Sequence, residues 1–298
     1  MFHKYLRAVG FSNIETREEL QSLISRSVKE ADRKSYTTVG KTGDVLYGEY
    51  HTMFADRCGL CVRGEYADDN TFRYDYYFPF LEGKGVTSEE DVCIERQLEK
   101  LSYAGVVDDY NMGIAIIFYL ESIITYIKYL NTDRLPLTGT TLTLSGLSEG
   151  GTILLPIKKD EEQKRQVKHE NMRKARMLAK AAEGDQEAIN NLTIKDMDTM
   201  GIVQKRVMQE DLYSVVDTCF MPYGIECDLY SVIGEITSYE LTKNKLTGEE
   251  IYILTLDIND MIFDVCVNKA DVTGEVAEGR RFKGNIWLQG RINYPDGE

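Results

Sequence analysis

The sequence predicts an α+β protein: an antiparallel meander sheet with covering helices, a helical connector and a small C-terminal β-barrel. Three observations lead to this prediction. Apolar residues repeat at helical spacing near the start and then alternate with a period of two over 44–100. A densely charged stretch covers 158–212, and short strand-like runs fill 213–298. We therefore divide the chain into segments 1–157, 158–212 and 213–298.

Composition excludes several classes of protein. The 298 residues are 43% hydrophobic, which is enough for a substantial core. There are 35 basic and 49 acidic residues, and the resulting charge of −14 argues against binding to nucleic acid or to an anionic membrane. Six cysteines in a chain of this size, with no apolar leader at its start, predict reduced thiols and a cytoplasmic location.

The first helix is expected at 17–33. Thr16 and Glu19 have capping-box spacing, in which each side chain bonds the other residue's backbone N–H. Apolar residues then follow at helical spacing, so one face of this helix is predicted to cover the sheet.

The meander is predicted from aromatic alternation. One strand face carries Phe72, Tyr74, Tyr76, Phe78 and Phe80, and charged residues lie on the other face. The neighbouring strands are marked by Val45/Tyr47, Leu60/Val62 and Val92/Ile94. Tyr74 and Tyr76 belong either to the core or to a binding groove.

The most apolar window, 112–130, predicts a buried strand-to-helix segment, with a helix that covers the sheet and whose start the pattern does not fix. Its length suggests a membrane span, but Glu121 at its centre argues against one. A hairpin is expected next, with strands 140–144 and 152–157 around a glycine-rich turn. The turn matches G-x-S-x-G at Ser148, but a hydrolase nucleophile is followed by a helix, and a strand-like run follows here.

The last segment predicts a barrel. Strand-like runs at 229–239, 250–258, 261–267 and 281–292 are typical of a small OB-like barrel, with an SH3-like barrel as the alternative. OB-like barrels bind single-stranded nucleic acid in a basic groove. Residues 223–298 hold seven basic and fourteen acidic residues, which weighs against that function.

Cys58 and Cys61 form a single C-x-x-C pair. An offset of three places the two side chains on opposite faces of a regular strand, so paired redox or metal chemistry requires a turn at Gly59. A zinc site would also need further ligands, for which His51 is one candidate. We expect no metal and no cofactor, and keep these cysteines as weak metal candidates.

A second constellation would suit an enzyme. Glu95, Arg96, Asp108 and Asp109 could gather around His51 if the meander brings them together, which would supply general acid–base groups. Histidine within a strand is more often a structural residue than a base.

Trp287 is the single tryptophan, and alternation places it on the polar face of its strand. Tryptophan is enriched at the centres of interfaces, so this residue predicts a contact surface and a possible homo-oligomer. Packing under a loop or against the neighbouring segment is an equal alternative.

Two stretches resemble a known family. They are 95–109, with the motif Ser-Tyr-Ala-Gly-Val-Val-Asp-Asp, and 214–228, with Phe-Met-Pro-Tyr-Gly-Ile-Glu-Cys-Asp. Together they resemble an uncharacterised clostridial family classed as a domain of unknown function. The resemblance implies a bacterial cytoplasmic protein and carries over no catalytic residue.

The sequence therefore favours a non-catalytic protein that binds an unknown protein or small molecule. An enzyme with a carboxylate/histidine pocket in the N-terminal segment is the alternative. Single-stranded nucleic-acid binding by the barrel is the second alternative.

Overall fold

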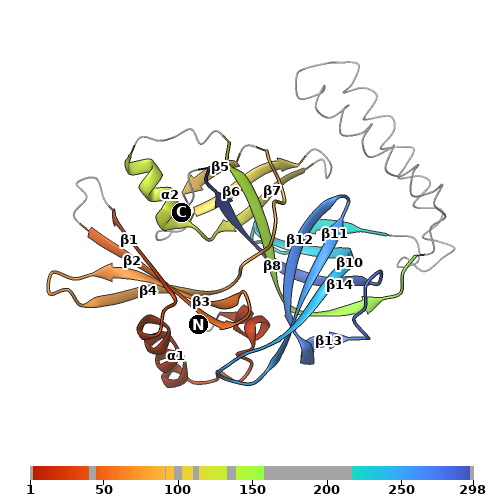
Figure 1. The fold of residues 1–298 in the computed structure, drawn as a ribbon, viewed down its shortest axis with the longest axis horizontal. Coiled ribbons are helices and arrows are strands. Elements are labelled where there is room, and N and C mark those ends of the chain that lie inside the picture. The colour runs from red at the N-terminus through yellow and green to blue at the C-terminus, as the bar shows by residue number, and fades with distance from the viewer. Residues whose placement is uncertain are drawn as a thin grey trace, which may run out of the picture.

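The computed structural model describes residues 3–39, 45–90, 92–96, 103–109, 114–132, 139–157 and 217–295. Two sheets organise these residues: a four-stranded sheet in the order β1-β2-β3-β4 and a ten-stranded sheet that contains all other strands (Figure 1). The predicted connector, 158–212, lies outside the described residues. Among the residues that are described, no helix is both long enough and apolar enough to cross a membrane.

The N-terminal helix is confirmed. A short 3₁₀ helix, η1 (Lys4–Val9), precedes α1 (Arg17–Lys29). The capping box is present: the Glu19 N–H donates to Thr16 Oγ1 at 3.2 Å, and the Thr16 N–H donates to the Glu19 carboxylate at 3.0 Å. The helix ends earlier than position 33 because Arg33 already belongs to the first strand.

The meander is confirmed for its first four strands, β1 (Arg33–Val39), β2 (Val45–Ala55), β3 (Cys58–Tyr66) and β4 (Phe72–Leu81). Strand β5 (Val92–Arg96) does not join this sheet. It pairs instead with β6 (Tyr103–Asp109) at one end of the ten-stranded sheet. Alternation of apolar and polar residues shows which face of a strand is buried, but not which strand it pairs with. The pattern over 44–100 therefore did not show that β5 belongs to a different sheet.

The apolar window contains a strand followed by a helix. Strand β7 (Ile114–Leu120) lies between β6 and β14 (Arg281–Asn293), and α2 (Ile123–Asn131) follows it. This is the predicted strand-to-helix segment, and the structure places the start of its helix at Ile123. The helix begins after the apolar run because a short continuous apolar run suits a fully buried strand.

A closed five-stranded barrel forms the larger part of the second sheet. Its strands are β8 (Thr141–Leu154), β10 (Leu229–Lys243), β11 (Glu250–Ile258), β12 (Met261–Asn268) and β14 (Arg281–Asn293). Strand β8 closes the ring by pairing antiparallel to β14 and parallel to β12. The predicted hairpin at 140–157 is therefore wrong, because this stretch is one continuous strand. Smaller elements complete the sheet and its connections: β9 (Cys219–Pro222), β13 (Val272–Thr273) and η2 (Lys269–Asp271).

Two hydrophobic cores result. One fills the barrel and continues under β7 and α2, with Phe263, Phe282 and Ile286 at 1% exposure or less. The other lies between the four-stranded sheet, the N-terminal helices and the outer face of the barrel. The outer face of β14 is therefore covered by the chain itself, which explains why an apolar residue occupies position 287.

Candidate functional site

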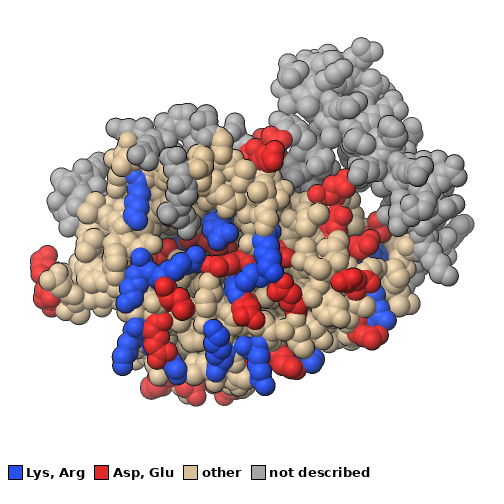
Figure 2. Space-filling model, viewed as in Figure 1, with Lys and Arg blue, Asp and Glu red and all other residues tan. Residues whose placement is uncertain are grey.

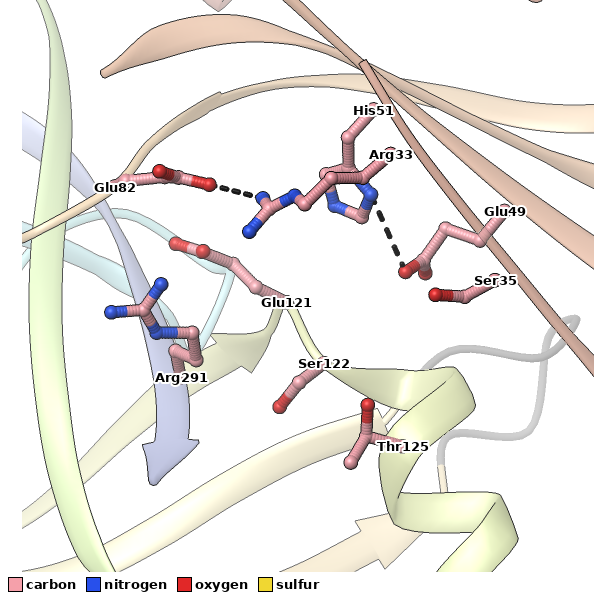
Figure 3. Close-up of a pocket in the computed structure, with 9 residues that line it drawn as sticks. All are labelled: Arg33, Ser35, Glu49, His51, Glu82, Glu121, Ser122, Thr125 and Arg291. Atoms are coloured by element: carbon pink, nitrogen blue, oxygen red, sulfur yellow. Dashed lines mark hydrogen bonds and ion pairs between the residues drawn. The ribbon is translucent and has the colours of Figure 1, made fainter. Parts of the chain in front are cut away.

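A polar pocket lies where the four-stranded sheet meets the β7–α2 junction and strand β14 (Figure 3). It holds about 50 Å³ of open space. Because one water needs about 10–15 Å³ of such space, the pocket has room for roughly three to five waters or one small polar ligand. Nine residues line it: Arg33, Ser35, Glu49, His51, Glu82, Glu121, Ser122, Thr125 and Arg291.

The floor of the pocket follows from strand periodicity and register. Glu49 and His51 are two residues apart on β2 and therefore share a face. Across the antiparallel pair, Glu49 lies opposite Arg63 and His51 lies opposite Cys61. Directly opposite residues share a face of the sheet, so this register brings all four polar side chains together.

Arg63 anchors that face. It is 1% exposed, and its Nε forms an ion pair with Glu49. The other guanidinium nitrogens donate to the Tyr119 hydroxyl at 2.8 Å and to the Glu121 carbonyl at 2.5 Å, and the guanidinium lies 4.5 Å from the centre of the Phe78 ring. These contacts link the four-stranded sheet to the end of β7 and orient the Glu49 carboxylate.

Glu121 is a buried carboxyl group at the junction of β7 and α2. Its backbone N–H donates to the Gly290 carbonyl at 2.9 Å, and its carboxyl group accepts from Ser145 Oγ at 3.1 Å. Burial raises the pKa of Glu121 to about 7, against the opposing effect of the nearby Arg291 charge. At neutral pH this side chain is therefore partly protonated, and it can either accept or donate a proton.

His51 is neutral in this setting. Burial lowers its pKa to about 4, and the positive charges of Arg33, Arg63 and Arg291 act in the same direction, while Glu49 opposes them. The Nδ1 atom lies 3.6 Å from the Glu49 carboxylate, which is longer than a hydrogen bond. Within the described part of the chain, neither ring nitrogen of His51 forms a hydrogen bond, so the imidazole can still accept a ligand.

Two arginine side chains form the outer wall of the pocket, and they differ in their ion pairing. Arg33 forms an ion pair with Glu82, whereas no described carboxylate lies within ion-pair distance of Arg291. Ser122 is 7% exposed, and its hydroxyl has no hydrogen-bond partner among the described residues. A buried hydroxyl without a partner costs free energy, which makes Ser122 a candidate contact for a polar group.

The structure does not gather the predicted enzyme constellation. Only His51 of that set lines the pocket. Glu95 and Asp108 are exposed on β5 and β6, and the backbone of Arg96 and Asp109 belongs to the same two strands. The pocket does combine histidine with carboxylates, but these come from Glu49, Glu82 and Glu121.

The predicted binding residues lie elsewhere. Tyr74 is 43% exposed on β4, and Tyr76 lies on the same strand, partly buried. Trp287 is 5% exposed: its ring stacks on Tyr5 at 5.5 Å, and its indole N–H donates to Asp228 at 2.8 Å. Its observed contacts are therefore within the chain, on the outer face of the barrel.

The C-x-x-C residues point to different neighbours. Both lie in β3 and are fully buried. The Cys58 Sγ lies 3.5 Å from Cys266 Sγ on the barrel, whereas Cys61 lies beside Glu49 and His51. This is the opposite-face arrangement that the spacing predicts. Ser148 lies in the middle of β8 rather than in a turn, and its hydroxyl lies 2.8 Å from two backbone carbonyl oxygens, those of Gly150 and Asn285.

Sequence reasoning missed the arginines of the pocket and most of its carboxylates. One signal was present. Glu121 is the single acidic residue in the most apolar window, 112–130, and a buried acidic residue is usually paired with other polar groups. Arg63 sits among apolar residues of β3, which is a similar signal. Arg33, Glu82 and Arg291 lie far apart in the sequence and carried no signal.

Fold and pocket together define a β-rich protein in which a four-stranded sheet packs on a closed barrel and a polar pocket lies beside their contact. A family model described as a domain of unknown function from an E. rectale gene, DUF3881, matches residues 6–290. The chain belongs to this family, as the resemblance of its two motifs indicated. No curated protein and no solved structure matches the chain.

Proposed function

We propose that this chain is a bacterial cytoplasmic protein that binds a small polar ligand in the pocket beneath β1 and β2. The observation that carries the proposal is the unpartnered, buried hydroxyl of Ser122, which lines the same pocket as Arg291. Together they offer a hydroxyl and a guanidinium to a ligand that brings hydrogen-bond acceptors.

Native mass spectrometry of the freshly purified protein, beside its denatured mass, tests this proposal. We expect extra mass that is retained only in the native spectrum and that Ser122→Ala and Arg291→Gln each reduce. Arg280→Gln is the matched control, because Arg280 pairs with Glu275 at the surface, away from the pocket. The same spectrum reports the oligomeric state, which stays a prediction.

The proposal fails if the native spectrum shows the bare chain and if thermal unfolding is unchanged across a panel of small carboxylates, phosphates and sugars. It also fails if retained mass is unaffected by both pocket variants.

An enzyme is the second candidate, and Glu121 favours it. A carboxyl group with a pKa near 7 that lines a polar pocket is suited to general acid–base catalysis. An enzyme would convert a retained ligand into product. Glu121→Gln should then abolish this turnover while the ligand still binds, which would distinguish an enzyme from a simple binding protein.

Nucleic-acid binding receives less support. A closed five-stranded barrel is consistent with an OB-like description of the fold. However, basic and acidic side chains are interleaved on the face shown in Figure 2 rather than arranged as a continuous basic track. Absence of binding to a single-stranded oligonucleotide at low salt would end this candidate.

A further inference from the structure

The face shared by β2 and β3 carries three different metal-ligand types in one small volume. Glu49, His51 and Cys61 each offer one ligand atom, and these atoms all lie within 4.8 Å of one another. Cys61 is fully buried and Glu49 is 3% exposed, so these donors are not a solvated surface cluster.

We propose that Glu49, His51 and Cys61 form a binding site for Zn²⁺ or a similar borderline-soft divalent cation. The carboxylate, imidazole and thiolate are the three side-chain ligand types that zinc accepts, and three protein ligands with one open position are typical of zinc sites that react with small molecules. This proposal rests on the donor cluster and not on the identity of the pocket ligand.

The geometry is close to what zinc requires. With zinc bonds of about 2.0–2.3 Å, tetrahedral ligand atoms are about 3.3–3.7 Å apart. The Glu49 Oε1 and His51 Nδ1 atoms are already 3.6 Å apart. The remaining pairs lie within 4.8 Å and must close by at most about 1.5 Å, which rotation of side chains supplies.

The surroundings complete the site. Arg63 pairs with one oxygen of Glu49, so the other oxygen stays directed at His51. The His51 Nδ1 atom is too far from Glu49 for a hydrogen bond, so this nitrogen is free of a hydrogen bond to its nearest carboxylate. Glu49 and His51 also line the pocket, which provides an entry path for the metal.

Charge limits the affinity of the site and predicts proton release. Zinc with one carboxylate and one thiolate is neutral, but Arg63 then lacks a fully available counter-ion. Cysteine binds zinc as the thiolate, so metal binding releases the thiol proton of Cys61.

The test uses the full chain, treated with a chelator and then titrated with Co²⁺ as a spectroscopic probe. We expect one equivalent to bind with a thiolate-to-cobalt charge-transfer band and the intense visible bands of tetrahedral Co²⁺. Zinc should displace it. Loss of a metal's outer-shell partner costs about 10–100-fold in affinity, so loss of a direct ligand in Cys61→Ala should cost more than about 100-fold.

Cys58→Ala is the matched control. Cys58 is buried on the same strand, three residues away, but faces Cys266 on the barrel. The charge-transfer band should survive this substitution and disappear in Cys61→Ala. If Cys61→Ala fails to fold, as circular dichroism would show, X-ray absorption of the zinc-loaded wild-type chain gives the answer, because it must show one sulfur ligand.

The proposal is overturned if the wild-type chain binds no stoichiometric metal, or if the bound metal has no sulfur ligand. It is equally overturned if Cys58→Ala abolishes the band. Ligand retention by the chelator-treated chain is measured separately, so failure of the metal site leaves the pocket proposal intact, and the reverse also holds.

Discussion

At the scale of single residues, the buried carboxyl group of Glu121 has the property of the pocket that is most readily tested, its raised pKa. Glu121 is raised in pKa because it is removed from water, although Arg291 and Arg63 oppose the shift. Ser145 on β8 and Glu82 after β4 also act on this carboxyl group. Burying this group in its charged form costs folding free energy, which has a measurable pH signature.

We expect Glu121 to weaken the fold as pH rises from about 5 to 7. In this window the native state binds more protons at Glu121 than the unfolded state does, so the free energy of unfolding falls with rising pH. Glu121→Gln cannot titrate, and it should therefore remove up to about 3 kcal/mol of this decline between pH 5 and 8.

Urea unfolding of both proteins at pH 5 and pH 8 measures the effect. Comparing the two proteins cancels the titration of the other carboxylates. Equal pH dependence in wild type and Glu121→Gln would show that Glu121 titrates normally.

At the scale of elements, the start of α1 is defined by local chemistry. Thr16 and Glu19 satisfy each other's backbone N–H groups, and Leu23 and Ile24 then bury one helix face against the four-stranded sheet. The residues that define this helix lie close together in the chain, which explains why the helix was predictable.

Thr16→Ala should destabilise the protein by about 1 kcal/mol, because two N–H groups at the helix start lose their partner or its orientation. Thr16→Ser keeps the hydroxyl and should recover most of that loss. Thermal or urea unfolding checks the pair of variants. A Thr16→Ala protein as stable as wild type would mean that water replaces the cap at no cost.

At the scale of the whole molecule, the four-stranded sheet and the barrel share a core. Leu60 and Phe78 from the sheet, and Ile253 and Trp287 from the barrel, belong to one buried cluster. Burial of this apolar surface is lost by both parts when either unfolds. We therefore expect the two sheets to unfold together.

Coincident transitions would demonstrate this behaviour. Fluorescence of Trp287 reports the shared core, and far-ultraviolet circular dichroism reports all strands, so both should give the same urea midpoint. Leu60→Ala should lower both midpoints equally, because loss of this fully buried side chain costs about 2–5 kcal/mol of the free energy of unfolding. Leu46→Ala, at 40% exposure on β2, is the control and should shift neither strongly. Two separated transitions would contradict a shared core.

The pocket is also a property of the whole molecule. Its residues come from β1, β2, the end of β4, the β7–α2 junction and β14. No sequence window contains more than a few of them, so spacing alone could identify His51 but not its partners. The carboxylates proposed from sequence were Glu95, Asp108 and Asp109, and they would lie near His51 only if the predicted meander brought these segments together.

What the sequence by itself determined was local: the capped helix α1, the alternating strands β2 to β4, the opposite faces of Cys58 and Cys61, and the family. These features depend on residues within a few positions of each other, where backbone geometry alone decides which side chains meet. The tertiary structure alone decided that β5 leaves the meander, that β8 closes the barrel, and that Trp287 is buried. Strand pairing and burial depend on partners distant in the chain, and the period of a strand carries no information about which partner it finds.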